Sequence, residues 1–494
     1  MRRCCLTFLF VVLAATFSLA EAISSGPACD DILYWLASGI SSARIQRLTH
    51  STDGDGLACK VTPACTRALQ QGGASSALIQ NLTGHTSGYP KQAGKLPVAS
   101  SAACTCSGTA SEVAALVRAK KLDDAEEKVR AALRDDPANG NLLFVLGAIL
   151  QREERFDDAI DTFAEAAHNE PGFPETHGHL SYLFYRNGDS DSALAEARTA
   201  LSMDPANAEA YRYLGLALYG SGHYEAALNA FEKSLEREGE VADVYFDIGI
   251  TERDRGELRK AVIAYKKAIT LRPDFWQAHS NLGVVLHDQG RLDEAVAEYR
   301  IAVRLNPDEP SVRNNLGNTL CDKEDFDHAI SEFQQLYKQT PDWDGGHNCL
   351  ARAYMSKKDY PAAIRELRAA IVTNPAGAAE HRVLGQALLL TGKDEEALEV
   401  LRKAVELNPE SALGHRYLGT AFVNTQQMEE AEKEFREALR LEPNAQNHYA
   451  LAACLMALNR YDEALGELEI ASRLDPHENL YRARMQEAAR MLAK

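Results

Sequence analysis

The sequence lacks the features that mark several large classes of protein. Lys and Arg total 53 against 71 Asp and Glu, which leaves a formal net charge of −18 and no excess of positive charge. Nucleic acids and anionic membrane surfaces both attract basic stripes, so neither partner is expected. Beyond residue 22 no run approaches the roughly 20 apolar residues of a membrane span, so stable membrane insertion is not expected either.

Catalytic motifs are missing as well. The chain contains no Gly-x-Ser-x-Gly nucleophile elbow and no His-Glu-x-x-His metal motif. A repeat, described below, occupies most of the chain and leaves no block of about 150 residues for a catalytic domain. We therefore predict that the protein is not an enzyme and uses no cofactor.

The first 22 residues have the pattern of a segment that is removed after export. Two arginines at 2–3 precede an apolar run over 6–20, and the small-x-small cleavage signal Ala-Glu-Ala follows at 20–22. We expect a signal peptide over 1–22, a mature chain that begins near Ile23, and a periplasmic or extracellular protein.

Cysteine use fits an oxidising compartment. Three of the cysteines that remain after cleavage lie far along the chain, at Cys321, Cys349 and Cys454. The other five cluster early and are candidates for disulfide bonds whose pairing the sequence leaves open. The candidates are Cys29, Cys59, Cys65, Cys104 and Cys106.

Prolines recur at a fixed interval through most of the sequence. Successive members are separated by 34 residues or twice 34, Gly239 stands at the one missing position, and Pro476 follows the last after 33. Such a period predicts one structural unit repeated end to end, with a long surface in place of a single pocket. The prolines are Pro137, Pro171, Pro205, Pro273, Pro307, Pro341, Pro375, Pro409 and Pro443.

One repeat, residues 211–239, has the pattern of two helices joined by a turn. Leu214, Gly215 and Leu218 mark one face of the first helix, and Ala227 and Phe231 continue it on the second, after a Gly-Ser-Gly turn. Positions within a repeat are numbered so that Gly215 is position 8, Ala227 is position 20 and Phe231 is position 24. The small residues at positions 8 and 20 let the two helices approach closely, and the large residue at position 24 fills the space between them. Proline near position 32 ends the second helix.

This pattern resembles the tetratricopeptide repeat (TPR). Leu-Gly recurs at 146, 214, 282, 316, 384 and 418, and the position-20 alanine recurs eleven times, from Ala125 to Ala464. The resemblance implies an all-α fold: a right-handed superhelix (α-solenoid) of eleven repeats over 106–478, whose first helices line a concave groove. Residues 479–494 are expected to form a capping helix. The Asn-Leu-Gly triplets at 281 and 315 are similar to repeats of the O-linked N-acetylglucosamine transferase, whose catalytic domain has no counterpart here.

Two repeats depart from the pattern. The first has Glu112-Val113 in place of Leu-Gly, so its first helix is degenerate and acts as the N-terminal cap. At Gly239 the proline that would stop the helix is missing, and Glu252 stands in the next repeat where neighbours have Leu, Phe or Tyr. We predict a change of pitch or a flexible joint near 236–256.

A different module precedes the repeats. Within residues 23–82, segments 39–48 and 73–82 are near copies, each predicted to form a turn and a Ser-capped helix. Between them, Asp53 and Asp55 hint at a calcium loop, but the position of its bidentate Glu is Ala64, which favours a simple turn. Residues 83–105, rich in Gly, Ser and Thr, are predicted to be a flexible linker.

Histidines recur at position 4 of several repeats. A ladder of imidazoles invites a metal-binding interpretation, but position 4 holds a large packing residue in TPR proteins, so we interpret these side chains as packing between helices. They are His177, His279, His347, His381, His415 and His448.

Function is expected in the groove. Positions 5 and 9 of successive first helices carry amides and guanidinium groups, which suit an extended peptide and a carboxylate. The predicted site comprises Asn314, Asn318, Asn348, Arg352, Arg382 and Arg416. We predict an interaction scaffold for a protein or peptide partner. The alternative is a structural subunit of a cell-envelope machine that exports or assembles polysaccharide, pili or outer-membrane proteins.

Overall fold

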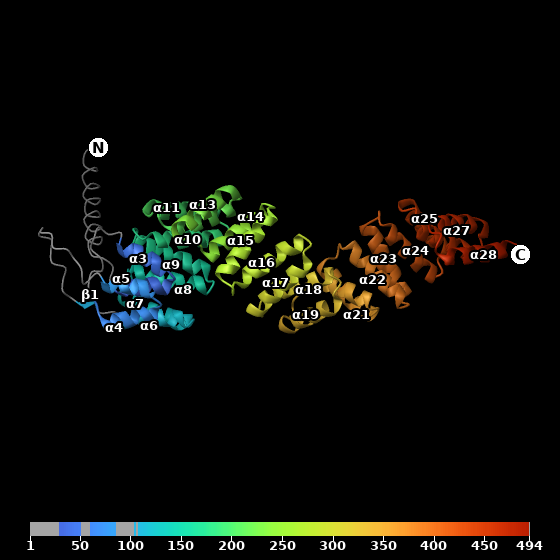
Figure 1. The fold of residues 1–494 in the computed structure, drawn as a ribbon. Helices are drawn as coiled ribbons and strands as arrows, with labels where there is room; N and C mark the ends of the chain where they lie inside the picture. The colour runs from blue at the N-terminus through green and yellow to red at the C-terminus, as the bar shows by residue number, and fades with distance from the viewer. Residues whose placement is uncertain (1–28, 51–59, 85–102, 105–106, 494) are drawn as a thin grey trace, which may run out of the picture. The chain divides into compact units, whose positions relative to one another are not determined.

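The structure is a computed structural model that describes residues 29–50, 60–84, 103–104 and 107–493. Its described residues are almost all helical, as Figure 1 shows. The chain divides into two compact units, residues 1–255 and 256–494, and the boundary falls between the two helices of the fifth pair.

The described elements of the first unit comprise a small N-terminal module and the first nine helices of the repeats. In chain order they are α2 (Cys29–Ser38), α3 (Ser42–His50), β1 (Lys60–Val61), α4 (Pro63–Gly72), α5 (Ser76–Gly84), β2 (Ala103–Cys104), α6 (Gly108–Arg118), α7 (Leu122–Asp135), α8 (Gly140–Arg152), α9 (Phe156–Asn169), α10 (Pro174–Arg186), α11 (Ser190–Met203), α12 (Ala208–Gly220), α13 (Tyr224–Glu238) and α14 (Ala242–Asp254).

The described elements of the second unit are all helices. They are α15 (Leu258–Leu271), α16 (Trp276–Asp288), α17 (Leu292–Leu305), α18 (Pro310–Asp322), α19 (Phe326–Gln339), α20 (His347–Ser356), α21 (Tyr360–Thr373), α22 (Ala378–Leu390), α23 (Asp394–Leu407), α24 (Ala412–Asn424), α25 (Met428–Leu441), α26 (Ala445–Ala457), α27 (Tyr461–Leu474) and α28 (Asn479–Leu492).

The predicted α-solenoid is confirmed. Helices α6 to α27 follow one another as eleven first and second helices, and α28 lies where the sequence predicts a cap. The packing has the predicted cause. A Cβ atom added at Gly147 would lie 2.9 Å from the ring of Phe163, and one added at Gly419 would lie 2.7 Å from the ring of Phe435. Glycine at position 8 is therefore what allows the large residue at position 24 to fit.

The turn inside each pair also repeats. One residue at this turn has a positive φ in all eleven pairs, which reverses the chain tightly between the helices. Glycine provides it in five pairs, and six pairs use other residues, such as Lys120 and Asn459. The turn is therefore imposed by packing and does not depend on glycine alone.

Second helices end as predicted, two residues before the recurring proline, as α9 does before Pro171. The expectation of a missing stop at Gly239 is wrong. Gly239 itself ends α13, with a φ of +87° that other residues rarely adopt. Glu252 is only 7% exposed and pairs with Arg255 at 2.7 Å, so its charge is compensated. The predicted joint near 236–256 stays a prediction.

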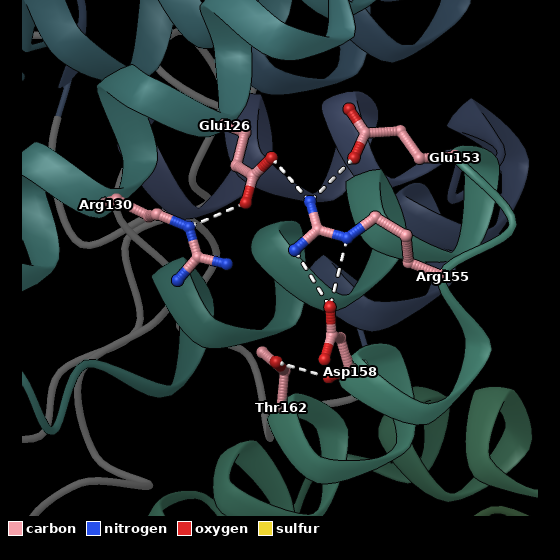
Figure 2. A network of polar contacts seen from close by, with 6 residues as sticks. All are labelled: Glu126, Arg130, Glu153, Arg155, Asp158 and Thr162. Carbon is pink, nitrogen blue, oxygen red and sulfur yellow. Dashed lines mark hydrogen bonds and ion pairs between the residues drawn. The ribbon is translucent and has the colours of Figure 1, made fainter.

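Ion pairs link neighbouring repeats at the turns. Figure 2 shows Arg155, between α8 and α9, surrounded by carboxylates. Its guanidinium reaches Glu126 of the preceding repeat at 2.9 Å and Asp158 of its own at 2.8 Å. Arg460 repeats the arrangement with Glu432 and Glu463, both at 2.6 Å. The side chains of Arg155 and Arg460 are 41% and 38% exposed, so solvent screens these pairs and each contributes little to the stability of the array.

The N-terminal module packs against the repeats. Helix α2 contacts α6 and α8, and α4 contacts α6. Ile32, Leu33 and Ile45 of the module belong to the same buried cluster as Phe144 and Phe163 of the repeats. The described part of the module and the first repeats therefore share one hydrophobic core.

Both near copies in the module fold as predicted. Gly39 and Gly73 have positive φ, and the hydroxyls of Ser41 and Ser75 accept hydrogen bonds from the first turns of α3 and α5. One feature differs from the predicted linker over 83–105. Residues 103–104 form β2, which pairs in parallel with β1. Backbone pairing of two residues leaves too little pattern in the sequence to be foreseen.

No helix among the described residues is long and apolar enough to span a membrane.

Candidate functional site

The six predicted site residues all lie on first helices of the second unit. Asn314 and Asn318 belong to α18, Asn348 and Arg352 to α20, Arg382 to α22 and Arg416 to α24. We call the surface that they share with α26 and α28 the first-helix face. The sequence therefore placed these residues on the correct helices, while their roles as a binding site stay a prediction.

Two of the six bridge neighbouring helices. The amide nitrogen of Asn348 donates to Glu380 of α22 at 2.9 Å, and Arg352 donates to Asp322 of α18 at 3.1 Å. Asp322 also faces His287 of α16 at 3.0 Å. Burial acts to raise the pKa of Asp322, but the bonds from His287 and Arg352 outweigh it and hold the pKa below its usual value. These bonds brace neighbouring first helices, and the partner-binding role of Asn348 and Arg352 stays a prediction.

The two other arginines have no such partner. Neither Arg382 nor Arg416 forms an ion pair with a carboxylate in the described part of the chain, although acidic residues outnumber basic ones. Arg416 donates to the amide oxygen of Gln446 on α26 at 2.5 Å, a neutral acceptor that orients the guanidinium without neutralising it. These two guanidinium groups on α22 and α24 are therefore not held in an ion pair within the described part of the chain.

Asn314 and Asn318 differ in their surroundings. The side-chain oxygen of Asn314 is buried without a hydrogen-bond partner, and it lies near the indole nitrogen of Trp343, which is also unpaired. Asn318 is partly buried. Neither residue lines a pocket described below, so the structure gives less support to these two than to the arginines.

Arg416 lines a pocket of about 440 Å³ at the end of the first-helix face. Its walls come from α24, α26 and α28, and Phe435 of α25 also lines it. One carboxylate, Glu478 at the start of α28, belongs to the lining as well. Tyr449 and Tyr481 face each other with ring centroids 5.4 Å apart. Aromatic walls with one guanidinium suit a side chain that is apolar and lies next to a negative group. We call this the Arg416 pocket.

Sequence reasoning missed the two tyrosines. Tyr449 occupies position 5 of the eleventh repeat, so it continues the row of Asn314, Asn348, Arg382 and Arg416 by one step. Extending the row would have found it. Tyr481 belongs to α28, which the sequence marked only as a cap, and its contact with Tyr449 depends on how that helix packs.

A cysteine also lines the Arg416 pocket. Burial raises the pKa of the Cys454 thiol to about 11, with a smaller contribution from Glu432. A thiol that stays protonated at neutral pH is a poor nucleophile. This thiol therefore contributes packing to the pocket.

A disulfide joins Cys321 of α18 to Cys349 of α20. Both side chains are buried, and their Cα atoms lie 5.8 Å apart. The predicted disulfide candidates all lie in the N-terminal cluster and do not include this pair, whose cysteines are 28 residues apart along the chain. The bond ties two neighbouring first helices together in the middle of the first-helix face.

The recurring histidines are packing residues, as predicted, but they also pair with acids. Five of the six place Nδ1 at 2.6 to 2.8 Å from a glutamate nineteen residues later, on the second helix of the same repeat. His381 is the exception: Val400 stands at the glutamate position, and the ring bonds the carbonyl of Gly377 instead. The pairs are His177–Glu196, His279–Glu298, His347–Glu366, His415–Glu434 and His448–Glu467. No group of three metal-ligating residues occurs among the described residues.

In the first unit, the module covers the corresponding positions on the first helices. Trp35 donates to the side-chain oxygen of Asn141 on α8 at 3.0 Å, and its ring stacks on Phe173. Arg44 of α3 bonds Glu175 of α10 at 2.6 Å, and both residues are nearly buried, at 6% and 4% exposure. Asn141 and Glu175 occupy position 2 of their repeats, the position that Gln446 occupies in the Arg416 pocket.

The buried pair is electrostatically costly. Burial raises the pKa of Glu175, and the attraction of Arg44 offsets only part of this effect. Asp204 is a second carboxylate partner of Arg44, and the amide of Asn207 donates to Glu175 at 3.3 Å. The first helices therefore bind part of their own chain through an arginine, acids and an aromatic ring.

Of the remaining predicted residues, only Cys65 lies with its side chain in the described part of the structure. Cys65 is buried and disulfide-bonded. The side chains of Cys29, Cys59, Cys104 and Cys106 lie outside the described residues, as do Asp53 and Asp55.

Comparison with known proteins gives one family. The profile of the tetratricopeptide repeat matches residues 112–174, 180–243, 214–274, 246–310, 350–412 and 418–479. No curated protein sequence matches the chain.

Solved structures with a similar chain include several bacterial proteins. Pseudomonas aeruginosa pilF is 20% identical over 42% of this chain and 94% of its own, with a TM-score of 0.38. MamA is 27% identical over 33% and 95%, with a TM-score of 0.28. YrrB, described as a TPR protein with an unusual peptide-binding site, is 23% identical over 40% and 97%, with a TM-score of 0.31.

Proposed function

Because this chain belongs to the tetratricopeptide repeat family, we propose that it is an exported, non-catalytic scaffold that binds a protein or peptide. The partner binds along the first-helix face of the second unit. Its binding segment is an extended peptide that presents an apolar or aromatic side chain next to a carboxylate. The aromatic side chain enters the Arg416 pocket, and the carboxylate pairs with Arg416 or Arg382.

The observation on which this proposal rests is the pair of arginines. In a chain with a net charge of −18, two arginines one repeat apart form no ion pair among the described residues, and one of them lines an aromatic pocket. The single carboxylate in that lining, Glu478, accepts a hydrogen bond from the backbone of Leu480 at 2.9 Å. An arginine that pairs with a carboxylate in a partly desolvated pocket forms a strong, directional contact. Charge complementarity therefore favours an acidic segment over a basic one.

The test uses the full chain with both arginines reversed, Arg382→Glu and Arg416→Glu. Partners are captured from the envelope fraction and identified by mass spectrometry, and the affinity of each variant for a peptide from the captured partner is then measured by calorimetry. We expect the double reversal to lower the affinity by at least tenfold, about 1.4 kcal/mol. The matched control is Arg365→Glu, an exposed arginine on the second helix α21, which is expected to leave the affinity unchanged.

Capture that survives the double reversal unchanged contradicts the proposal. Stable capture of several envelope proteins with no dependence on either arginine would instead favour the structural-subunit alternative.

A further inference from the structure

A second cavity lies in the first unit, where the module meets the first two repeats. It has a volume of about 620 Å³, larger than the Arg416 pocket, and none of its lining residues belongs to the second unit. Its walls come from the turn before α3, the end of α4, the end of α6 and the end of α8. The proposed function of the second unit makes no use of it.

The charge of this cavity is opposite to that of the chain. Arg118, Lys120 and Arg152 line it, and no Asp or Glu does. Glu153, which directly follows Arg152 in the sequence, and Asp123, which follows Lys120 by three residues, are not part of the lining. Three cations without an acid, in a protein where acids predominate, produce a local positive potential that attracts an anion.

Both arginines are held in place without losing their charge. Arg152 donates to the carbonyl of Ala37 at 2.8 Å, and Arg118 donates to the carbonyls of Gln70 and Gln71 at 3.1 and 3.0 Å. Carbonyl oxygens orient a guanidinium but carry no formal charge. The side chain of Arg152 keeps solvent contact, yet surrounding protein removes enough water to lower its pKa, and no carboxylate counteracts this.

The rest of the lining favours an organic anion over a bare ion. Leu36, Ile40 and Val117 form apolar walls. Ser41 and Ser42 at the start of α3 also line the cavity, and both hydroxyls are bonded within the protein: Ser41 donates to Glu238 at 3.3 Å, and Ser42 accepts from the backbone of Ser75 at 3.0 Å. The N-terminus of a helix carries a partial positive charge that adds to the attraction for an anion. An inorganic phosphate would leave most of 620 Å³ unfilled and the apolar walls uncovered.

We propose that this cavity binds a small organic anion. Its carboxylate or phosphate group lies between Arg118, Lys120 and Arg152, and its apolar body lies against Leu36, Ile40 and Val117. Because the cavity is bounded by both the module and the repeats, bound ligand also strengthens the contact between them.

Calorimetry on the full chain at low ionic strength tests the proposal with four probes: hexanoate, hexyl phosphate, inorganic phosphate and hexanol. Hexanoate and hexyl phosphate share the anionic and apolar parts, and their relative affinity distinguishes a carboxylate from a phosphate ligand. We expect at least one of them to bind about tenfold more tightly than inorganic phosphate and hexanol, which lack one part each.

Substitution of Lys120 locates the site. Lys120 forms no side-chain bond that holds the fold, so Lys120→Gln is expected to weaken binding about tenfold without changing the unfolding midpoint, and Lys120→Glu more. Lys121→Gln is the matched control, because it removes the same charge from the next residue, which is exposed and does not line the cavity. The proposal is overturned if neither anionic probe binds saturably, if hexanol binds as tightly as they do, or if Lys120→Glu leaves their affinity unchanged.

Discussion

The two units present their first helices in different ways. In the first unit, the module lies on the first helices and contributes Trp35 and Arg44 to contacts with Asn141 and Glu175. In the second unit, position 2 of the eleventh repeat is Gln446, which lines the Arg416 pocket together with Arg416 at position 5 of the preceding repeat. Under the proposed function, one repeat pattern therefore supports two states of its first helices, one bound to its own chain and one that binds a partner.

The means of bracing differ as well. The described contacts of the module join α6, α8 and α10 in the first unit. In the second unit, the disulfide between α18 and α20 and the bonds of Asp322 perform this role. Under the proposed function, the first-helix face of the second unit binds a partner, and covalent and polar links between neighbouring helices brace it in place of a covering module.

The largest expected effect separates the module from the first unit. Arg44→Ala leaves the carboxylate of Glu175 buried without its partner, which costs about 3–5 kcal/mol. We expect faster hydrogen exchange across α2 and α3 and a lower unfolding midpoint for the first unit. Adding Glu175→Ala is expected to restore part of the loss.

The matched control for this change is Arg67→Ala, an exposed arginine of the same module. If the two variants show the same rate of hydrogen exchange across α2 and α3, the buried pair does not hold the module on the repeats. That result would contradict the comparison between the first helices of the two units.

The disulfide should account for the second largest effect. Removing it with Cys321→Ala and Cys349→Ala frees a loop of 28 residues, for which chain entropy predicts a loss of about 3.6 kcal/mol. Urea unfolding of the variant should show the loss in the second unit alone. Cys454→Ala, which removes a buried thiol that forms no disulfide, controls for the loss of a sulfur atom.

A smaller effect is expected from the pocket itself. Tyr481→Ala removes one wall of the Arg416 pocket without changing any charge. We expect the affinity for the partner peptide to fall about tenfold while the face stays folded, since α28 keeps its contact with α27. Unchanged affinity with an intact unfolding midpoint would show that the aromatic pair is not part of the binding site.

The smallest expected effect depends on pH. His415 faces two acceptors, Glu434 at 2.6 Å and the carbonyl of Pro409 at 2.9 Å, and the bond to Glu434 raises its pKa above the usual 6.5 despite burial. A raised folded pKa stabilises the fold fully below pH 6.5 and loses that contribution as pH rises through the folded value.

Glu434→Gln should therefore destabilise the second unit by about 1 kcal/mol at acidic pH and by almost nothing at alkaline pH. Val400→Ala, at the equivalent position opposite His381, is expected to have a cost that does not vary with pH. A loss for Glu434→Gln that is the same at both pH values would show that the pair is not charge-assisted.

Most of the fold could be predicted from local patterns in the sequence. The spacing of Leu-Gly, Ala and Pro identified the eleven helix pairs, because each residue type acts on its own repeat through close approach or helix termination. The end of α13 at Gly239 was not predicted, because the spacing of prolines does not include a glycine that ends a helix through a positive φ.

Contacts between residues that lie far apart along the chain could not be predicted from the sequence. The position-5 row predicted Arg382 and Arg416, yet Tyr481 enters the pocket from a terminal helix and Cys321 meets Cys349 across two repeats. The module's contacts with Asn141 and Glu175 join residues more than 100 positions apart, through single side chains that leave no periodic signal.

Amide hydrogen exchange of the full chain, with and without a peptide from the captured partner, tests the central claim most directly. The account predicts added protection on α24, α26 and α28, around Arg416, Tyr449 and Tyr481, and none on α8 and α10, where the module already lies. Protection that appears on α8 and α10 instead, or only on second helices, would contradict it.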